Sequence, residues 1–144
     1  MQDLPPDRAR QDLTPVEKEV VVPAPADEVW PAVTEPEQIS AWFGAEVEID
    51  VRPGGRGTVR WPDGTQRHVL VEEVEPERRL AFRWLPFERT AEGGVLPVPS
   101  SRVEITLDDV PGGTRIRVVE RPAFGAGRGP GERAAMATLA LASA

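Results

Sequence analysis

The sequence predicts an α+β domain built on an antiparallel sheet, and three observations carry this expectation. Apolar residues alternate with a period of two in a first segment, and the period then changes to about 3.6 over residues 26–44. Several later segments return to a period of two and are separated by Gly, Pro and Asp turns. Because strands and helices do not alternate along the chain, an α+β arrangement is favoured over a doubly wound sheet.

Length and composition fit one folded domain. The chain has 144 residues, of which 40% are hydrophobic and 28% are charged, as is ordinary for a globular protein. Residues 1–14 are polar, contain prolines and lack periodicity, so we expect a disordered arm there. Residues 15–144 are expected to form a single domain.

Charge and residue usage exclude several classes of function. The formal net charge of −7 disfavours binding to nucleic acid or to an anionic membrane surface. There is no cysteine and His68 is the single histidine, so we expect no metal site. No phosphate-binding or dinucleotide-binding motif is present, and we expect no cofactor. The amino terminus lacks a signal sequence and no apolar run could span a membrane, so a cytoplasmic protein is expected.

The first strand and a helix pair are expected at the start of the domain. Val16 begins a segment that turns continuously apolar, as in a strand entering a core. Two short helices follow, the first containing Pro31 and the second expected to have Thr34 as its N-cap and Pro36 in its first turn. Gly44 is suited to the carboxyl end of the second helix.

The remaining chain is expected to form five to six antiparallel strands and a closing helix. Leu80, Phe82 and Trp84 fall on one face of one strand, and a long loop is expected over residues 85–100. The outer face of the sheet is expected to carry charged side chains paired across strands, namely Arg60, Arg67, Arg83, Glu72 and Glu73. The Ala-rich residues 129–144 have helical spacing and form the predicted last helix.

Several strings, in this order, resemble one known family. They are VPAPADEVWPAVTEPEQISAWFGAEVEIDVRPGG, WPDG, VEEVEPERRLAFRW, SRVEITL and GGTRIRVVERPAF. Together they are similar to the START-like (SRPBCC) superfamily, in the branch named after the activator of the heat-shock chaperone's ATPase. The resemblance implies a helix-grip fold, in which a curved antiparallel sheet of about six to seven strands wraps around a carboxyl-terminal helix. It also implies a cavity between the sheet and the helices. The closing helix is expected to be shorter here than in usual members of the family.

The cavity wall is expected to consist mainly of aromatic and aliphatic side chains. The expected wall residues are Trp30, Trp42, Phe43, Trp61, Phe82, Trp84, Val103, Ile105, Ile116, Val118, Glu120, Phe124, Met136 and Leu139. Glu120 shares a strand face with Ile116 and Val118, which would point a carboxylate into the cavity. The interpretation that we favour for Glu120 is structural, with the carboxylate capping a turn or pairing with Arg121 or Arg83.

His68 alternates with Leu70 and is the second candidate for acid-base chemistry, although a solvated position near the preceding turn is favoured. The leading hypothesis is a domain that binds a small hydrophobic or amphipathic molecule and is not an enzyme. One alternative is an enzyme similar to the polyketide cyclases and aromatases of the superfamily, with Glu120 and His68 as acid and base. Another is a protein-interaction module whose partner is a chaperone or a transcriptional regulator.

Overall fold

The computed structural model describes residues 15–122. The predicted arm over 1–14 and the predicted closing helix over 129–144 lie outside the described residues. The elements in chain order are β1 (Val16–Val22), α2 (Ala26–Thr34), α3 (Pro36–Phe43), β2 (Glu46–Ile49), β3 (Arg56–Arg60), β4 (Gln66–Glu75), β5 (Arg79–Arg89), β6 (Val95–Pro97), β7 (Ser101–Val110) and β8 (Gly113–Pro122).

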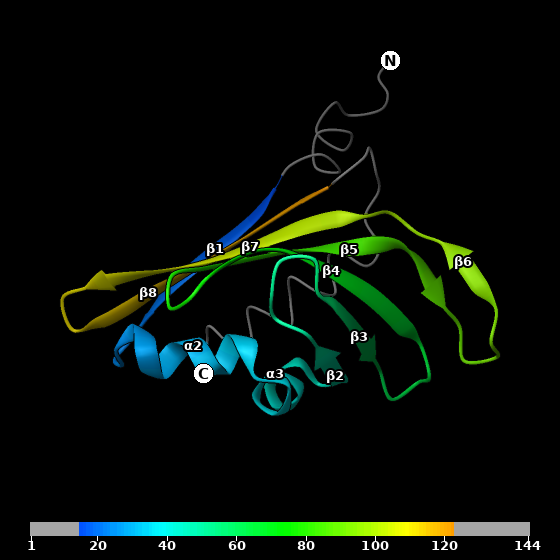
Figure 1. Ribbon diagram of the computed structural model, residues 1–144, viewed down its shortest axis with the longest axis horizontal. Coiled ribbons are helices and arrows are strands. Elements are labelled where there is room, and N and C mark those ends of the chain that lie inside the picture. Colours follow the sequence, from blue (N-terminus) through cyan, green and yellow to red (C-terminus); the bar gives the residue numbers. More distant parts are fainter. Residues whose placement is uncertain (1–14, 123–144) are drawn as a thin grey trace, which may run out of the picture.

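One curved antiparallel sheet contains all the described strands (Figure 1). Its order is β1-β8-β7-β5-β4-β3-β2, and the short β6 pairs only with β5. The chain therefore places its first strand beside its last described strand, so that β1 and β2 form opposite edges. This arrangement confirms the predicted α+β helix-grip class, and β6 brings the sheet to eight strands.

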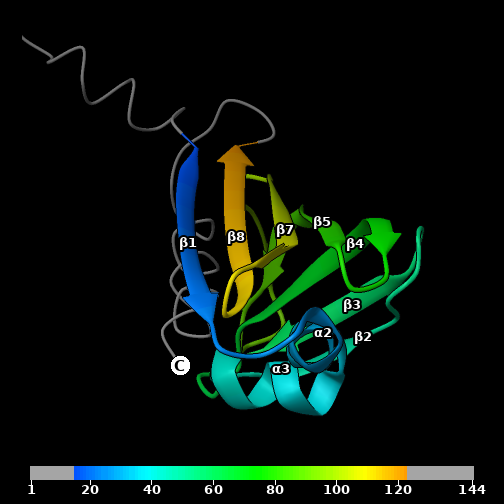
Figure 2. The same cartoon turned by 90° about the vertical axis from the view of Figure 1, so that its left-hand side faces the viewer.

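Helices α2 and α3 lie on the same side of the sheet and connect its two edges (Figure 2). Helix α3 ends where predicted, because Gly44 adopts a left-handed conformation with φ of 75° and its N–H bonds to the Ser40 carbonyl. The predicted N-cap is one residue early: Glu35 occupies that position, and Pro36 begins the helix. Thr34 ends α2 instead, with its hydroxyl donating to the Trp30 carbonyl at 2.9 Å.

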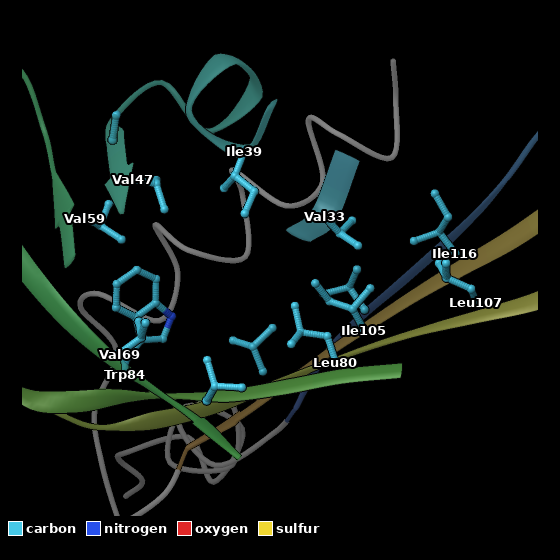
Figure 3. Close-up of a cluster of buried hydrophobic side chains, with 14 of the residues drawn as sticks. Val33, Ile39, Val47, Val59, Val69, Leu80, Trp84, Ile105, Leu107 and Ile116 are labelled. Carbon is cyan, nitrogen blue, oxygen red and sulfur yellow. The ribbon is translucent and has the colours of Figure 1, made fainter. Parts of the chain in front are cut away.

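The core lies between the helices and the sheet face that they cover, which we call the inner face (Figure 3). Alternate residues of each strand point toward it, as the period of two predicts. Val33 and Ile39 come from the helices and meet Leu80, Ile105 and other strand residues. Burial of this apolar surface is the main source of stability in the described domain.

The segment expected as a loop over 85–100 is largely strand. Strand β5 continues past Trp84 to Arg89 and forms a hairpin with β6. The alternation of inward and outward side chains along β5 is interrupted by a bulge. Arg67 of β4 pairs with Glu88, while Val69, two residues later, pairs with Trp84. A proline at position 86, which lacks an N–H, is tolerated within this bulge.

Candidate functional site

An apolar cavity of about 40 Å³ lies between the helices and the inner face of the sheet. It is lined by Val33, Ile39, Phe43, Val47, Ile49, Val59, Val69, Leu80, Phe82, Trp84 and Ile105. This volume holds only a few water-sized or methyl-sized groups. The cavity volume is therefore closer to that of a short apolar chain than to that of a bulky ring system.

Four of the predicted wall residues line this cavity, namely Phe43, Phe82, Trp84 and Ile105. Other predicted residues are part of the surrounding core without lining the cavity: Trp30, Trp61, Val103, Ile116 and Val118. The predicted residues Phe124, Met136 and Leu139, and the side chain of Trp42, lie outside the part of the chain that the structure describes. The helix residues Val33 and Ile39 are lining residues that the prediction omitted, although their helical spacing marked them as apolar.

Trp84 is the centre of an aromatic cluster at one end of the cavity. Its ring stacks on Trp61 with centroids 6.1 Å apart, and Phe82 meets it edge-on at 5.9 Å. Phe43 from α3 lies 6.3 Å away. The Arg67 guanidinium carbon lies 5.1 Å from the Trp84 ring centroid, within the range of a cation–π contact.

The position of Arg67 corrects the prediction that this residue belongs to the solvated outer face. It is 1% exposed and lies on the inner face with Val69 and Val71. Its Nη2 donates to the Leu85 carbonyl at 2.8 Å, and the bulge in β5 leaves this carbonyl available. Burial lowers the pKa of Arg67 to about 10, against the opposing influence of Glu88 and Glu120.

Glu120 lies on the inner face, as its strand position predicted, and is 4% exposed. The favoured structural interpretation allowed either a turn cap or an ion pair. Glu120 makes no ion pair with Arg121 or Arg83 among the described residues, and the next turn lies outside them. Oε2 of Glu120 instead accepts a hydrogen bond from the Ser101 hydroxyl at 2.5 Å. Burial raises the pKa of Glu120 to about 7, although the Ser101 hydrogen bond and the charge of Arg67 oppose this shift.

These polar side chains form a row across four strands, which we call the inner polar row: Arg67 on β4, Trp84 on β5, Ser101 on β7 and Glu120 on β8. The strand register supports this arrangement, because Trp84 lies opposite both Val69 and Ser101. Trp84 also lines the apolar cavity. The inner polar row and the apolar cavity therefore meet at Trp84.

Several buried atoms of the inner polar row have no hydrogen-bond partner among the described residues. They are Nε and Nη1 of Arg67, Nε1 of Trp84 and Oε1 of Glu120. A buried polar atom left unpaired costs about 1–3 kcal/mol, and more when the group is charged. A ligand that supplied hydrogen bonds to these atoms would recover part of that free energy.

His68 lies on the opposite face of β4 from Arg67 and is half-buried. Its ring is 5.3 Å from that of Phe87, and its Nδ1 is 3.3 Å from the Thr58 hydroxyl. Burial lowers the pKa of His68, and the nearby cations Arg89, Arg56 and Arg67 act in the same direction. The structure therefore does not bring His68 and Glu120 together as an acid-base pair.

The rest of the predicted outer-face network is present. Arg83 pairs with Glu72 at 2.9 Å, and Arg102 reaches both Glu72 and Glu73 at 2.7 Å. Arg60 pairs with Glu46 at 2.9 Å near the edge of the sheet. These pairs are partly exposed and satisfy each other, in contrast to the inner polar row.

Two other features are absent from residues 15–122. No helix in this range is long and apolar enough to cross a membrane. The same residues contain no group of three or more His, Asp or Glu side chains placed to hold a metal ion.

Comparisons with known proteins agree with this architecture. The family model described as activator of Hsp90 ATPase homolog 1-like protein matches residues 23–140. A crystal structure of a protein from the dynemicin biosynthetic locus is 31% identical with a TM-score of 0.66, and the match covers 90% of this chain. The match covers 46% of that protein, so this chain spans less than half of its length.

Two bacterial structures show the same fold at lower identity. A Mesorhizobium loti protein is 24% identical with a TM-score of 0.67, covering 89% of this chain and 90% of that one. A Bacillus halodurans protein is 26% identical with a TM-score of 0.59, covering 83% and 74%. Among curated proteins, none matches the sequence. The chain belongs to the activator of Hsp90 ATPase homolog 1-like family, a branch of the START-like (SRPBCC) superfamily.

Proposed function

We propose that this domain binds a small amphipathic molecule, with its apolar part in the cavity and its polar part at the inner polar row. The observation that carries the proposal is the shared position of Trp84, whose ring lines the cavity and also contacts the Arg67 guanidinium. An apolar ligand alone would leave the buried polar atoms beside the cavity unpaired. A ligand with both characters matches both parts of the site.

The size of the cavity determines what its apolar part can gain from the ligand. Each methylene group moved from water into the cavity contributes about 0.8 kcal/mol until the space is filled. A volume of about 40 Å³ is filled by a short chain unless neighbouring side chains move. Affinity should therefore rise over the first members of a homologous series and then level off.

Calorimetric titration with linear alcohols from butan-1-ol to decan-1-ol tests this proposal. We expect affinity to increase over the shorter alcohols and then to level off, and Val59→Phe, which enlarges a cavity-lining side chain, to abolish the increase. Leu70→Phe is the matched control. Leu70 lies on β4 but on the outer face of the sheet, so this variant should bind the alcohols like the wild type. A wild-type protein that binds none of the alcohols would refute the proposal.

A second candidate function is acid-base catalysis on the bound molecule. It is favoured by Glu120, a buried carboxyl group with a pKa raised to about 7, which can exchange a proton near neutral pH. The similarity to a protein from a biosynthetic locus is compatible with it. Octan-2-one in deuterated water tests it, because a base at Glu120 would accelerate deuterium incorporation beside the carbonyl. Equal exchange rates for wild type and Glu120→Gln would exclude this activity for that ketone.

A further inference from the structure

The unpaired atoms of the inner polar row differ in what they offer to a ligand. Nε and Nη1 of Arg67 and Nε1 of Trp84 are three unpaired donor nitrogens. Oε1 of Glu120 is an acceptor when the carboxyl group is ionised and can carry a donor when it is protonated. The inner polar row is therefore rich in donors, and its single unpaired acceptor becomes a donor when Glu120 is protonated.

Neighbouring contacts fix this row in place. Nη2 of Arg67 is held by the Leu85 carbonyl, and the guanidinium lies over Trp84. The Trp84 backbone is held in turn, because its carbonyl accepts from the buried Ser100 hydroxyl at 2.7 Å. Ser101 holds the other oxygen of Glu120. Such a fixed set of donors around a buried position is typical of a recognition site rather than of a surface ion pair.

We propose that the polar group recognised by the inner polar row is a carboxylate, and that Glu120 takes up one proton from solvent when this carboxylate binds. This inference rests on the proposed function, because the carboxylate is taken to be the polar end of the amphipathic ligand. It names the class of ligand as carboxylic acids with a linear alkyl chain. Arg67 and Trp84 donate to the ligand, and the protonated Oε1 of Glu120 donates to it as well.

Hydrogen-bonding capacity favours a carboxylate over other polar groups. A carboxylate offers about four acceptor positions, enough for one hydrogen bond from each of the three donor nitrogens and one from the O–H of protonated Glu120. A ligand hydroxyl has fewer acceptor positions and leaves at least one buried donor unpaired. An ammonium group would be repelled by Arg67, which remains charged because its pKa is about 10.

Proton uptake follows from the charges that face Glu120. Arg67 on β4 is the cation of the row, and Ser101 on β7 does not titrate. Lys18 on β1 pairs with Val118, two residues from Glu120, and is solvent-exposed. Glu88, opposite Arg67, adds negative charge near the guanidinium. A second buried carboxylate beside Glu120 is unfavourable unless one of the two binds a proton.

The test is calorimetric titration of the full chain with octanoate, octanamide and octan-1-ol at about pH 6 and about pH 8. We expect octanoate to bind about tenfold or more tightly than octan-1-ol at the lower pH, because only octanoate accepts from all the donors. Its affinity should fall about tenfold at the higher pH. Glu120, with a pKa of about 7, is mostly ionised there and must take up a proton before octanoate binds. The two neutral compounds should show no such dependence.

Two variants and a control assign the effect to residues. Glu120→Gln cannot titrate, so octanoate affinity should no longer change between the two pH values. Arg67→Met should remove the preference for octanoate over octan-1-ol, whereas Arg83→Met on the outer face should keep it. Thermal unfolding of each variant verifies that it is folded, and the wild-type pH dependence requires no variant at all.

The outcomes separate this inference from the function on which it rests. If octan-1-ol and octanamide bind as tightly as octanoate, or if octanoate binding does not depend on pH, the carboxylate inference is wrong and amphipathic binding stands. If none of the three compounds binds, the proposed function fails.

Discussion

Arg102 and Arg67 lie on opposite faces of the same sheet, and their surroundings shift their pKa values in opposite directions. The hydrogen bond to Glu72 raises the pKa of Arg102, whereas burial lowers that of Arg67 to about 10. The carboxylates show the same contrast. Burial acts to raise the pKa of Glu72, but hydrogen bonds from Arg102 and Arg83 outweigh it and lower that pKa. Burial dominates for Glu120, whose pKa rises to about 7.

The difference shows what each face does. On the outer face, Arg79, Arg83 and Arg102 share Glu72, Glu73 and Glu104, and the network covers the fully buried Ala81. Its charges are neutralised within the network and remain partly solvated, and Nε of Arg79 is its one buried atom without a partner among the described residues. On the inner face, Arg67 and Glu120 are almost fully buried and keep unpaired polar atoms. The outer network contributes modestly to stability, whereas the inner row lowers stability and, in the function that we propose, recognises the polar end of the ligand.

Removing one arginine from each face should give the largest difference in the free energy of unfolding. Arg67→Ala leaves the buried Glu120 without its cation and opens space beside Trp84, so we expect unfolding free energy to fall by about 3–5 kcal/mol. Arg102→Ala removes a partly exposed partner and should cost about 1 kcal/mol. Urea unfolding of both variants at about pH 7.5 measures the two losses. Equal losses would contradict the comparison.

The pH dependence of stability should distinguish the two glutamates. The pKa of folded Glu120 lies above its ordinary value of 4.5, so the native state holds more protons and stability falls as pH rises from about 4.5 to 7. The associated change is about 3 kcal/mol. Glu120→Gln should remove this decline when unfolding is measured at several pH values.

Glu72→Gln is the matched control for this experiment. Folded Glu72 has a lowered pKa, so its contribution is present above 4.5 and is lost as pH falls through its folded pKa. Replacing it should therefore leave the decline between about pH 4.5 and 7 intact. A decline that persists in Glu120→Gln would show that another group causes it.

Replacing one arginine and one glutamate together with apolar side chains should change stability in opposite directions on the two faces. Arg67→Met combined with Glu120→Leu removes two buried charges together, and we expect stability to remain equal or to increase by about 1–4 kcal/mol. Arg102→Met combined with Glu72→Leu should be destabilising, because Arg83 and Glu73 lose partners. Thermal unfolding compares the two double variants, and destabilisation of both would argue against an inner row that lowers stability.

The smallest expected effect is the influence of salt concentration on the stability loss of each arginine variant. Arg83→Ala should cost about 0.5 kcal/mol at low ionic strength, and the loss should shrink further at about 1 M salt because the pair is partly exposed. Arg67→Ala should be nearly insensitive to salt, since buried charges are poorly screened. Urea unfolding at two salt concentrations measures both. A similar salt response at the two positions would contradict their different environments.

The sequence was sufficient to predict the fold class because alternation, turn residues and helical spacing agree along most of residues 15–122, outside β4 and the segment over 85–100. It also placed Glu120 on the inner face, since β8 keeps its register with β7 up to that residue. The partner of Glu120 was not predictable, because Ser101 is nineteen residues away and Arg67 approaches from a different strand.

Arg67 was assigned to the wrong face for a local reason. Both faces of β4 carry apolar side chains, since Leu70 faces outward while Val69 faces inward. Alternation alone therefore gave no clear orientation there. The bulges beside His68 and Glu72 change the pairing with β5, and the unusual Pro86 was the signal of irregularity that the sequence did offer.

The most direct test of the account is a carbon-detected NMR titration of the glutamate side-chain carboxyl carbons in the folded protein. The contrast between the faces predicts that Glu120 titrates near pH 7 and that Glu72 titrates below its ordinary value of 4.5. This result would establish the inner row as a buried site of different electrostatic character from the outer network. A Glu120 that titrates together with Glu72 below 4.5 would contradict the central claim.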